Sequence, residues 1–398
     1  MAKAYTNKKQ EMFQSIFIYS LLMGVMIIFG VITSQNASKY ATTYGSTINQ
    51  PSFSRFETIF PLVIFAIVFG MRYDVGVDHL SYLENYIWQI DNPKFELIFS
   101  WITKICRSLN FHYSIYFAIL AFIQVFFFFY AFKDERYLFP FLVLFLFANG
   151  EWLNWMNIIR QSIAMCIWIY SIKFIEKKKF WLYLFWCIIA FFFHRSAIIL
   201  IIFYPILRNG KDYFKSIPLQ LLLLAAAFAI KNIFFDIILK FSSIVDFYIS
   251  LLGTNIYEYG YNIDRLLESF GEQKGTGVAY IFKIIVNVII ILYSTKLKKF
   301  FNSKRFNIIY FFYFFGLITL YMFPIGAISF TRPFRYFYIF QTIMLAYFAY
   351  YLSHSNIKVI NNKILAYILI VCYLGIFYLN HILATPDSHL WYQFYFQH

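Results

Sequence analysis

The chain has 398 residues, of which 61% are hydrophobic, 24% are aromatic and only 13% are charged. Soluble domains have about a quarter charged residues, so this composition excludes a water-soluble globular fold. The formal net charge of +15 lies in short clusters between apolar runs, which is typical of a membrane protein's cytoplasmic loops and argues against a nucleic-acid partner. The cysteines are spaced singly, so we expect neither disulfides nor a zinc site: Cys106, Cys166, Cys187 and Cys372.

The N-terminal part of the chain begins with two apolar runs. Residues 12–33 follow three lysines, as in a signal peptide, but the run is too long for one and further spans follow, so we expect a membrane helix. A polar connector, residues 34–56, leads to a second helix that ends near Arg72. Residues 72–111 then form an external segment, in which the amphipathic stretch 95–109 is expected at the membrane interface.

Two basic clusters, residues 173–179 and 296–305, set the orientation, because cytoplasmic loops are rich in Lys and Arg. Counting back from the first cluster, we expect helix 155–175 to run inward, helix 137–149 outward and helix 112–132 inward. Residues 151–155 then lie outside. This assignment also places the N-terminus outside, against the charge bias of its lysines.

Between the two clusters the number of crossings must be even, although only three apolar blocks lie there: 180–207, 217–235 and 278–295. We expect the first block to be a hairpin of two short legs, interrupted at His194 and Arg195, which is tolerable where the legs are packed inside protein. The alternative places the extra crossing at residues 241–252. Residues 236–277, rich in acidic residues and glycine, are predicted as a large external loop.

The C-terminal part contributes further crossings. Helix 306–323 runs outward, residues 324–335 form an external or re-entrant segment, helix 336–352 returns and helix 364–383 exits. The sequence therefore predicts an all-α polytopic membrane protein with about eleven transmembrane helices, some of them short or re-entrant. Residues 1–398 are expected to form a single membrane-embedded domain whose external loops form the active site.

Ionisable groups at membrane depth cost about 2.5–3.5 kcal/mol, so they point to function. Arg72 follows the second helix, and Gly76 allows a sharp turn that is expected to aim Asp74 and Asp78 back toward it. The structural alternative is an Arg at a helix end that extends to the interface.

A second polar motif lies in the predicted helix 155–175. Asn157, Arg160 and Gln161 are spaced so that they would share one helical face. A buried Arg with amide neighbours suits an anionic oxygen ligand, because guanidinium offers a fixed fork of donors. The structural alternative is an Arg that caps the carbonyls of a broken helix.

The remaining motifs also carry arginine. His194, beside Arg195 at the hairpin tip, is a candidate general base, although a packing histidine is nearly as frequent. Arg332 and Arg335 form a cationic pair before an inward helix. Together with Arg72 and Arg160, these arginines fall at the external face, where the charge rule depletes them, and we infer an anionic ligand there. No nucleotide-binding glycine loop or nucleophile elbow is present in the sequence, so a pyrophosphate or a lipid phosphate is expected.

The motifs, in this order, resemble the EpsG family of Wzy-type polysaccharide polymerases. The resemblance rests on residues 72–78 (RYDVGVD) with Tyr82, on 157–164 (NIIRQSIA), on 193–197 (FHRSA), and on the late Arg332 and Arg335. A polar and aromatic tail, residues 391–394 (WYQF), adds to it. The chain departs from the family pattern at His79, where an aromatic residue is common.

The resemblance implies a metal-independent glycosyltransferase of the cytoplasmic (inner) membrane whose active site faces the periplasm or exterior. It would join oligosaccharide repeat units carried on undecaprenyl pyrophosphate, and a hydroxyl of the acceptor unit would attack the anomeric carbon of the donor chain. No cofactor is expected. The partners are the lipid-linked oligosaccharides, membrane lipids and, as a candidate, a protein that regulates chain length.

The roles that this reaction needs are a cationic site for the leaving pyrophosphate and a base for the acceptor hydroxyl. We expect catalysis and substrate binding from these residues: His194, Asp74, Asp78 and Arg160 as catalytic groups, and Arg72, Arg195, Arg332, Arg335, Tyr82, Asn157 and Gln161 as substrate-binding groups.

Two alternatives remain. A ligase that moves finished O-antigen from the lipid carrier to another acceptor would use the same donor and similar cations. A flippase for lipid-linked sugars is the non-enzymatic alternative, and it would carry symmetric repeats and mid-membrane charges, which the sequence does not display. The repeat-unit sugars are open, as is the product: lipopolysaccharide, capsule or exopolysaccharide.

Overall fold

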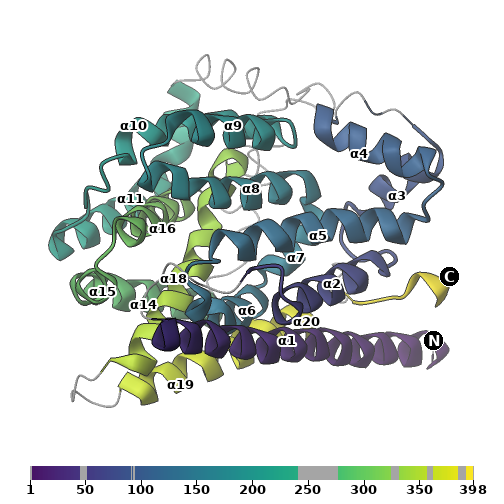
Figure 1. The fold of residues 1–398 in the computed structure, drawn as a ribbon, viewed down its shortest axis with the longest axis horizontal. Helices are drawn as coiled ribbons and strands as arrows, with labels where there is room; N and C mark the ends of the chain where they lie inside the picture. The colour runs from purple at the N-terminus through teal and green to yellow at the C-terminus, as the bar shows by residue number, and fades with distance from the viewer. Residues whose placement is uncertain are drawn as a thin grey trace. The chain divides into compact units, whose positions relative to one another are not determined.

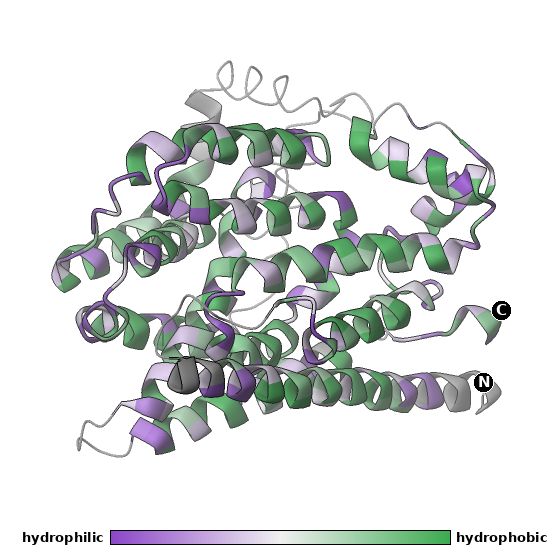
Figure 2. Cartoon of the chain, in the orientation of Figure 1, coloured by the Kyte–Doolittle hydropathy of each residue, from purple (hydrophilic) through white to green (hydrophobic). Residues whose placement is uncertain are grey.

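A computed structural model describes residues 2–44, 52–90, 92, 95–240, 277–323, 331–355, 362–383 and 391–397. Within these residues the backbone is helical apart from turns and one isolated antiparallel bridge, as Figure 1 shows. Figure 2 shows that hydrophobic residues predominate on most of the helices, as the composition predicts. The chain divides into two compact units: Met1–Lys173, Trp181–His194 and Leu345–His398 form the first, and Phe174–Phe180 and Arg195–Met344 form the second.

The first unit contains most of the N-terminal and all of the C-terminal helices. Long helix α1 packs along α6 and α2, and α2 packs along α5 (Figure 1). The helices that lie in this unit or begin in it are α1 Ala2–Tyr44, α2 Phe56–Gly70, α3 His79–Ile87, α4 Leu97–Ser108, α5 Tyr113–Ala131, η2 Arg136–Leu138, α6 Phe139–Ala148, α7 Glu151–Asn157 and α8 Ile159–Glu176. The others are α9 Phe180–Phe191, α19 Asn362–Cys372, the π-helix η6 Tyr373–Tyr378, α20 Leu379–Leu383 and η7 Tyr395–Gln397.

The second unit is built on the packing of α11 against α16. Asn287 of α14 is buried between two tyrosines of α16, where it donates to Tyr321 (3.2 Å) and accepts from Tyr313 (3.0 Å). These bonds satisfy polar groups that would be costly in an apolar interior. Its helices are η3 Arg195–Ile202, α10 Phe203–Leu207, α11 Ile217–Lys240, α14 Val278–Leu292, α15 Ser294–Phe301, α16 Lys304–Met322 and η5 Arg332–Phe334, and α18 Arg335–His354 begins here.

Three described helical stretches are long and apolar enough to cross a membrane: Gln10–Lys39, Tyr113–Ala131 and Lys304–Met322. Two sharply bent helix pairs, Arg136–Ala148 with Glu151–Asn157 and Val278–Leu292 with Ser294–Phe301, raise the number to five. The chain is therefore a multi-pass helical membrane protein. The remaining apolar helices are shorter, so the eleven predicted crossings stay a prediction.

Two expectations from the sequence were wrong. The polar connector 34–56 was expected to follow the first helix, but α1 extends into this connector as far as Tyr44. Helix 155–175 was expected to be continuous, but the chain forms α7 and α8 with a break at Ile158, whose ψ of 50° leaves the helical range. The predicted break at His194 was correct, because α9 ends at Phe191 and η3 begins at Arg195. Most of the predicted loop 236–277 and of the segment 324–335, and all of the alternative crossing 241–252, lie outside the described residues.

The contact between α2 and α5 depends on the last residue of α2. A Cβ atom on Gly70 would lie 2.3 Å from the carbonyl oxygen of Ser114 and 2.7 Å from Cβ of Ala118. Both distances are too short for van der Waals contact, so the two helices could not approach as they do with any larger residue. Gly24 in α1, in contrast, has nothing within 4 Å of such an atom.

We expect Gly70→Ala to lower the free energy of unfolding by about 1–3 kcal/mol, because α2 and α5 must separate to admit the methyl group. Gly24→Ala is the matched control, and its helix should gain about 0.5–1 kcal/mol from the lower backbone entropy of alanine. The measurement is the thermal unfolding midpoint of each purified variant in one detergent. Equal midpoints for the two variants would contradict the close helix approach.

Candidate functional site

The turn after α2 places the first motif, and it is built from two residues with left-handed backbone. Asp74 has φ 48° and Gly76 has φ 101°. A Cβ atom on Gly76 would lie 2.5 Å from Oδ1 of Asn157, so glycine is required both by its conformation and by the close approach of this side chain. The turn therefore brings residues 72–78 against the end of α7, which joins two motifs that are distant in the sequence.

Arg72 is buried in this turn, with only 2% of its surface exposed. Its Nη2 donates to the carbonyl oxygen of Met156 (3.2 Å), and its guanidinium lies over the rings of Phe69 (5.7 Å) and Phe117 (5.4 Å). Burial lowers the pKa of Arg72 to about 10, so it stays charged at neutral pH. The sequence predicted that Asp74 and Asp78 would turn back toward Arg72. That was wrong, because the partner of Arg72 is a backbone carbonyl.

The bond from Arg72 ends at the break between α7 and α8. Helix carbonyls beside a break lose their intrahelical partners, and a guanidinium satisfies one of them here. Asn157 is the last residue of α7, whereas Arg160 and Gln161 lie in the first turn of α8. The prediction that these three residues share one face of a continuous helix was therefore wrong. Asn157 faces Gly76. The side chain of Arg160 instead contacts Glu96 and Tyr82.

Arg160 lies in a polar cluster of the first unit with Glu96 and Tyr82. Its Nη1 lies 2.6 Å from Oε2 of Glu96, and its Nε donates to the hydroxyl of Tyr82 (3.2 Å). The guanidinium also lies 5.1 Å from the ring centre of Phe95, which stacks on Tyr82 at 5.8 Å. The side chain of Arg160 remains 22% exposed and that of Glu96 8%, so the pair lies just beneath the surface.

Glu96 is the residue of this cluster that the sequence did not predict. It occupies the N-cap position of α4, in a stretch whose pattern predicts only an amphipathic surface helix. The signal was present, because Glu96 is an acidic residue beside Phe95 and Leu97 in an otherwise apolar and basic stretch. A charge-assisted contact at 2.6 Å holds the guanidinium fork in place.

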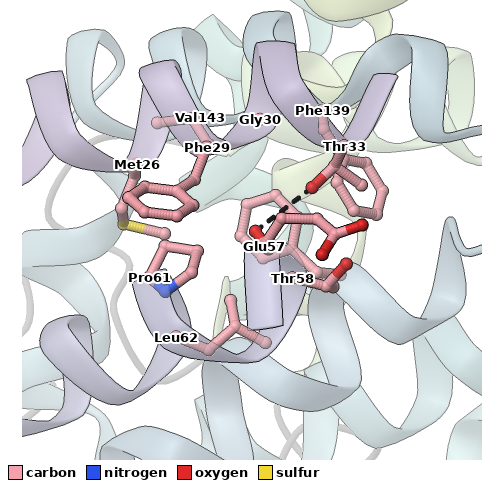
Figure 3. A pocket seen from close by; sticks show the side chains of 11 residues that line it. Met26, Phe29, Gly30, Thr33, Glu57, Thr58, Pro61, Leu62, Phe139 and Val143 are labelled. Carbon is pink, nitrogen blue, oxygen red and sulfur yellow. Dashed lines mark hydrogen bonds between the residues drawn. The ribbon is translucent and has the colours of Figure 1, made fainter. Parts of the chain in front are cut away.

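A cavity of about 280 Å³ adjoins the Arg160 cluster, with Phe95 forming part of its wall. This volume is near the lower end of ligand pockets, at about 300 Å³. The second cavity, drawn in Figure 3 between α1, α2 and α6, holds only about 10 Å³ and is lined largely by apolar side chains beside Glu57. It could hold a single water molecule at most, so it is too small for a sugar.

The other predicted residues divide between the two units. His194 follows α9 in the first unit, where its N–H donates to the carbonyl of Ala190 (2.9 Å). Arg195, Arg332 and Arg335 belong to the second unit. There η3 packs against η5, and the hydroxyls of Ser196 and Tyr336 are 3.1 Å apart, which brings the segments of these arginines together.

The C-terminal tail completes the first unit by pairing with the turn after α2. Tyr73 donates its N–H to the carbonyl of Gln393 (2.9 Å), and Tyr395 donates to Met71 (2.9 Å). Arg72 and Phe394 form the antiparallel bridge between these two bonds. The tail therefore fixes the backbone of Arg72, and the side chain of Arg72 binds the carbonyl of Met156 at the break between α7 and α8.

Tyr392 anchors this tail, since it is 0% exposed. Its hydroxyl donates to the carbonyl of Val68 in the last turn of α2 (2.6 Å), and its N–H donates to Ser15 Oγ of α1 (2.7 Å). Tyr392 thus joins α1, α2 and the tail, through its backbone N–H and its hydroxyl. The aromatic and polar tail noted in the sequence has a structural role as a clamp on the first motif.

We expect Tyr392→Ala to lower the free energy of unfolding by about 3–5 kcal/mol, the usual cost of removing a buried aromatic ring. Tyr392→Phe should cost only about 1 kcal/mol, because the ring still packs and a single hydrogen bond is lost. Phe396→Ala, where the ring is 61% exposed, serves as the control and should have little effect. Unfolding midpoints of the purified variants test this order, and a tail that merely rests on the surface would give three similar values.

His79 explains the departure from the family pattern. It is 0% exposed and stacks on Phe117 at 4.8 Å, so it packs as the aromatic residue that is common there would. Its Nδ1 accepts the N–H of Asp74 (3.2 Å), which leaves the single proton of the neutral ring on Nε2. Burial, together with the charge of Arg72, lowers the pKa of His79 to about 2.

This pKa predicts how stability depends on pH. Because the pKa of His79 is lower in the folded state than its ordinary value of 6.5, the unfolded chain binds the proton first as the pH falls. Stability from this group is fully present above pH 6.5 and is lost below it, by about 2 kcal/mol between pH 7 and pH 5. His79→Gln should remove this loss, whereas replacement of the exposed His354 by Gln should retain it. Unfolding midpoints at the two pH values measure the difference.

Three comparisons place the chain among known proteins. A profile of the EpsG family matches residues 57–396. This range includes the motifs of Arg72 and Arg160 and nearly all of the C-terminal tail. No curated protein and no solved structure matches the chain. The match covers most of the sequence and contains every candidate site residue. The chain therefore belongs to the EpsG family.

Proposed function

We propose that this protein is a polysaccharide polymerase that joins oligosaccharide repeat units carried on undecaprenyl pyrophosphate. The family supports a polymerase of the exopolysaccharide or O-antigen kind. The single observation that carries the residue roles is the cluster of Arg160, Glu96 and Tyr82 beside a cavity of about 280 Å³. The site lies at the outer face of the membrane in the topology of about eleven crossings that the sequence predicts.

The reaction needs positive charge where the leaving group forms. The acceptor hydroxyl oxygen bonds to the anomeric carbon of the donor, the bond from that carbon to the pyrophosphate oxygen breaks, and the electron pair stays on the pyrophosphate. In this proposal Arg160 stabilises that charge, because fixed donors act most strongly in a site shielded from water. Glu96 positions the guanidinium, and Tyr82 holds its Nε edge.

The remaining residues have supporting roles in the proposal. Arg72 is a positioning residue, since its buried side chain holds the carbonyl of Met156 beside the break that precedes Arg160. Arg195, Arg332 and Arg335 lie in the second unit, and their binding of pyrophosphate stays a prediction from the sequence. The acceptor proton passes to His194, Asp74 or Asp78 as general base. Asn157 and Gln161 contribute amide groups near the break.

We expect Arg160→Ala to reduce polymer formation at least about 100-fold, as removal of a charge-stabilising donor does in other enzymes. Arg160→Lys should restore part of the activity, since Lys keeps the charge but loses the planar fork. Glu96→Gln should shorten the chains, because the guanidinium is then held less firmly. The measurement is surface-glycan electrophoresis of a strain that lacks the gene and expresses each variant at equal membrane levels.

A second arginine–glutamate contact provides the matched control. Arg55 lies 3.7 Å from Glu57 outside this cluster, and Arg55→Ala should leave the glycan ladder unchanged. Single repeat units on the acceptor lipid in the deletion strain support a polymerase. Finished long chains that accumulate on the carrier would instead identify a ligase, and an unaltered glycan would reject the proposed function.

A further inference from the structure

Helix α4 presents three different faces along its twelve residues. One face is buried in the first unit through Phe99, Thr103 and Cys106. A second lines the 280 Å³ cavity through Ser100, Thr103, Lys104 and Arg107. The third is exposed and apolar, and begins at Leu97. Since each residue advances by about 100° around a helix, the cavity face lies between the buried face and the exposed apolar face.

The cavity is cationic on the side that α4 contributes. The described residues that line it are Ile90, Asn92, Phe95, Ser100, Thr103, Lys104 and Arg107, which include two cations and no carboxylate. Ser100 and Thr103 already donate to the carbonyls of Phe95 (3.3 Å) and Phe99 (2.9 Å). The charge of this lining selects an anionic group rather than a neutral sugar.

The exposed face of α4 is a continuous apolar stripe. Leu97, Trp101, Ile105 and Leu109 follow one another at intervals of four residues and are 44%, 56%, 57% and 56% exposed. Residues at this spacing lie in one row along a helix. Lys104 lies beside the row, so the stripe runs along the edge of the cationic cavity. Such a surface suits a ligand with a long apolar chain and an anionic head, and Trp is typical of headgroup depth.

The cavity is also one side chain away from Arg160. Phe95 forms part of its wall, and the same ring lies 5.1 Å from the guanidinium of Arg160. Phe95 therefore borders both the cavity and the cluster around Arg160. This proximity connects the exposed apolar face of α4 with the cluster around Arg160.

We propose that α4 binds the prenyl diphosphate of the lipid carrier, with its phosphate in the cavity beside Lys104 and Arg107 and its apolar chain along the stripe of Leu97, Trp101, Ile105 and Leu109. The identity of the lipid rests on the proposed function. The site itself rests on the charge of the cavity and on the stripe beside it.

The test measures equilibrium binding of labelled farnesyl diphosphate to the full-length protein in a neutral detergent. Lys104→Glu and Trp101→Ser should each weaken binding about tenfold, and Lys363→Glu, an exposed lysine on α19, should not. Arg107 is left unchanged because it also donates to the carbonyls of Asn85 and Ile90. Unfolding midpoints confirm that the variants are folded.

Competition identifies the source of the phosphate. Unlabelled undecaprenyl diphosphate should compete well, whereas inorganic pyrophosphate, farnesol and phosphatidylglycerol should each compete at least about tenfold less well. Equal competition by pyrophosphate or by farnesol would overturn the combined site, and equal competition by phosphatidylglycerol would indicate a general anionic-lipid site instead. An effect of Lys363→Glu equal to that of Lys104→Glu would also overturn it.

Glycan electrophoresis of the same variants separates the two proposals. Short chains with Arg160→Ala together with normal prenyl diphosphate binding by Lys104→Glu would reject the α4 site and leave the polymerase in place. Weakened binding by Lys104→Glu in a protein whose deletion leaves the glycan unchanged would reject the polymerase and leave the lipid site.

Discussion

The bond from the buried guanidinium of Arg72 to the carbonyl of Met156 is the interaction on which the first unit's site depends. A charged group that is 2% exposed among aromatic rings needs polar partners, and the helix break offers its Nη2 a carbonyl that an intact helix would not. The buried guanidinium donor of Arg72 and the carbonyl at the helix break therefore satisfy each other. The break between α7 and α8 then starts a new helix, and Arg160 lies in its first turn.

The C-terminal tail and two glycine residues support this contact. Backbone pairing of residues 71–73 with 393–395 fixes the direction in which Arg72 leaves α2, and Tyr392 ties the tail to α1 and α2. Gly70 and Gly76 permit the close approaches to α5 and to Asn157. Segments from both ends of the chain thus converge on one arginine, which accounts for the presence of a polar aromatic tail on a membrane protein.

The Arg160 cluster differs from the Arg72 contact in its exposure and in its partners. Arg160 is held by a carboxylate and a phenol at the surface of the unit, beside a cavity, whereas Arg72 is enclosed by rings. One arginine suits a role in organising the backbone, and the other a role in contacting substrate. The structural alternative for Arg160, an arginine that caps a carbonyl of a broken helix, is therefore filled by Arg72 instead.

Sequence alone determined the helical membrane class, the breaks near His194 and after Gly70, and the family. These features are local, because each apolar run must satisfy its own backbone hydrogen bonds in a bilayer, and because the motifs are short. The tertiary structure decided the partners. Glu96 lies 64 residues from Arg160, and the tail lies more than 300 residues from Val68, so no helical period could pair them. The partners of the break at Ile158 are equally distant in the sequence, since Arg72 donates to the carbonyl of Met156 and Gln124 to that of Trp155.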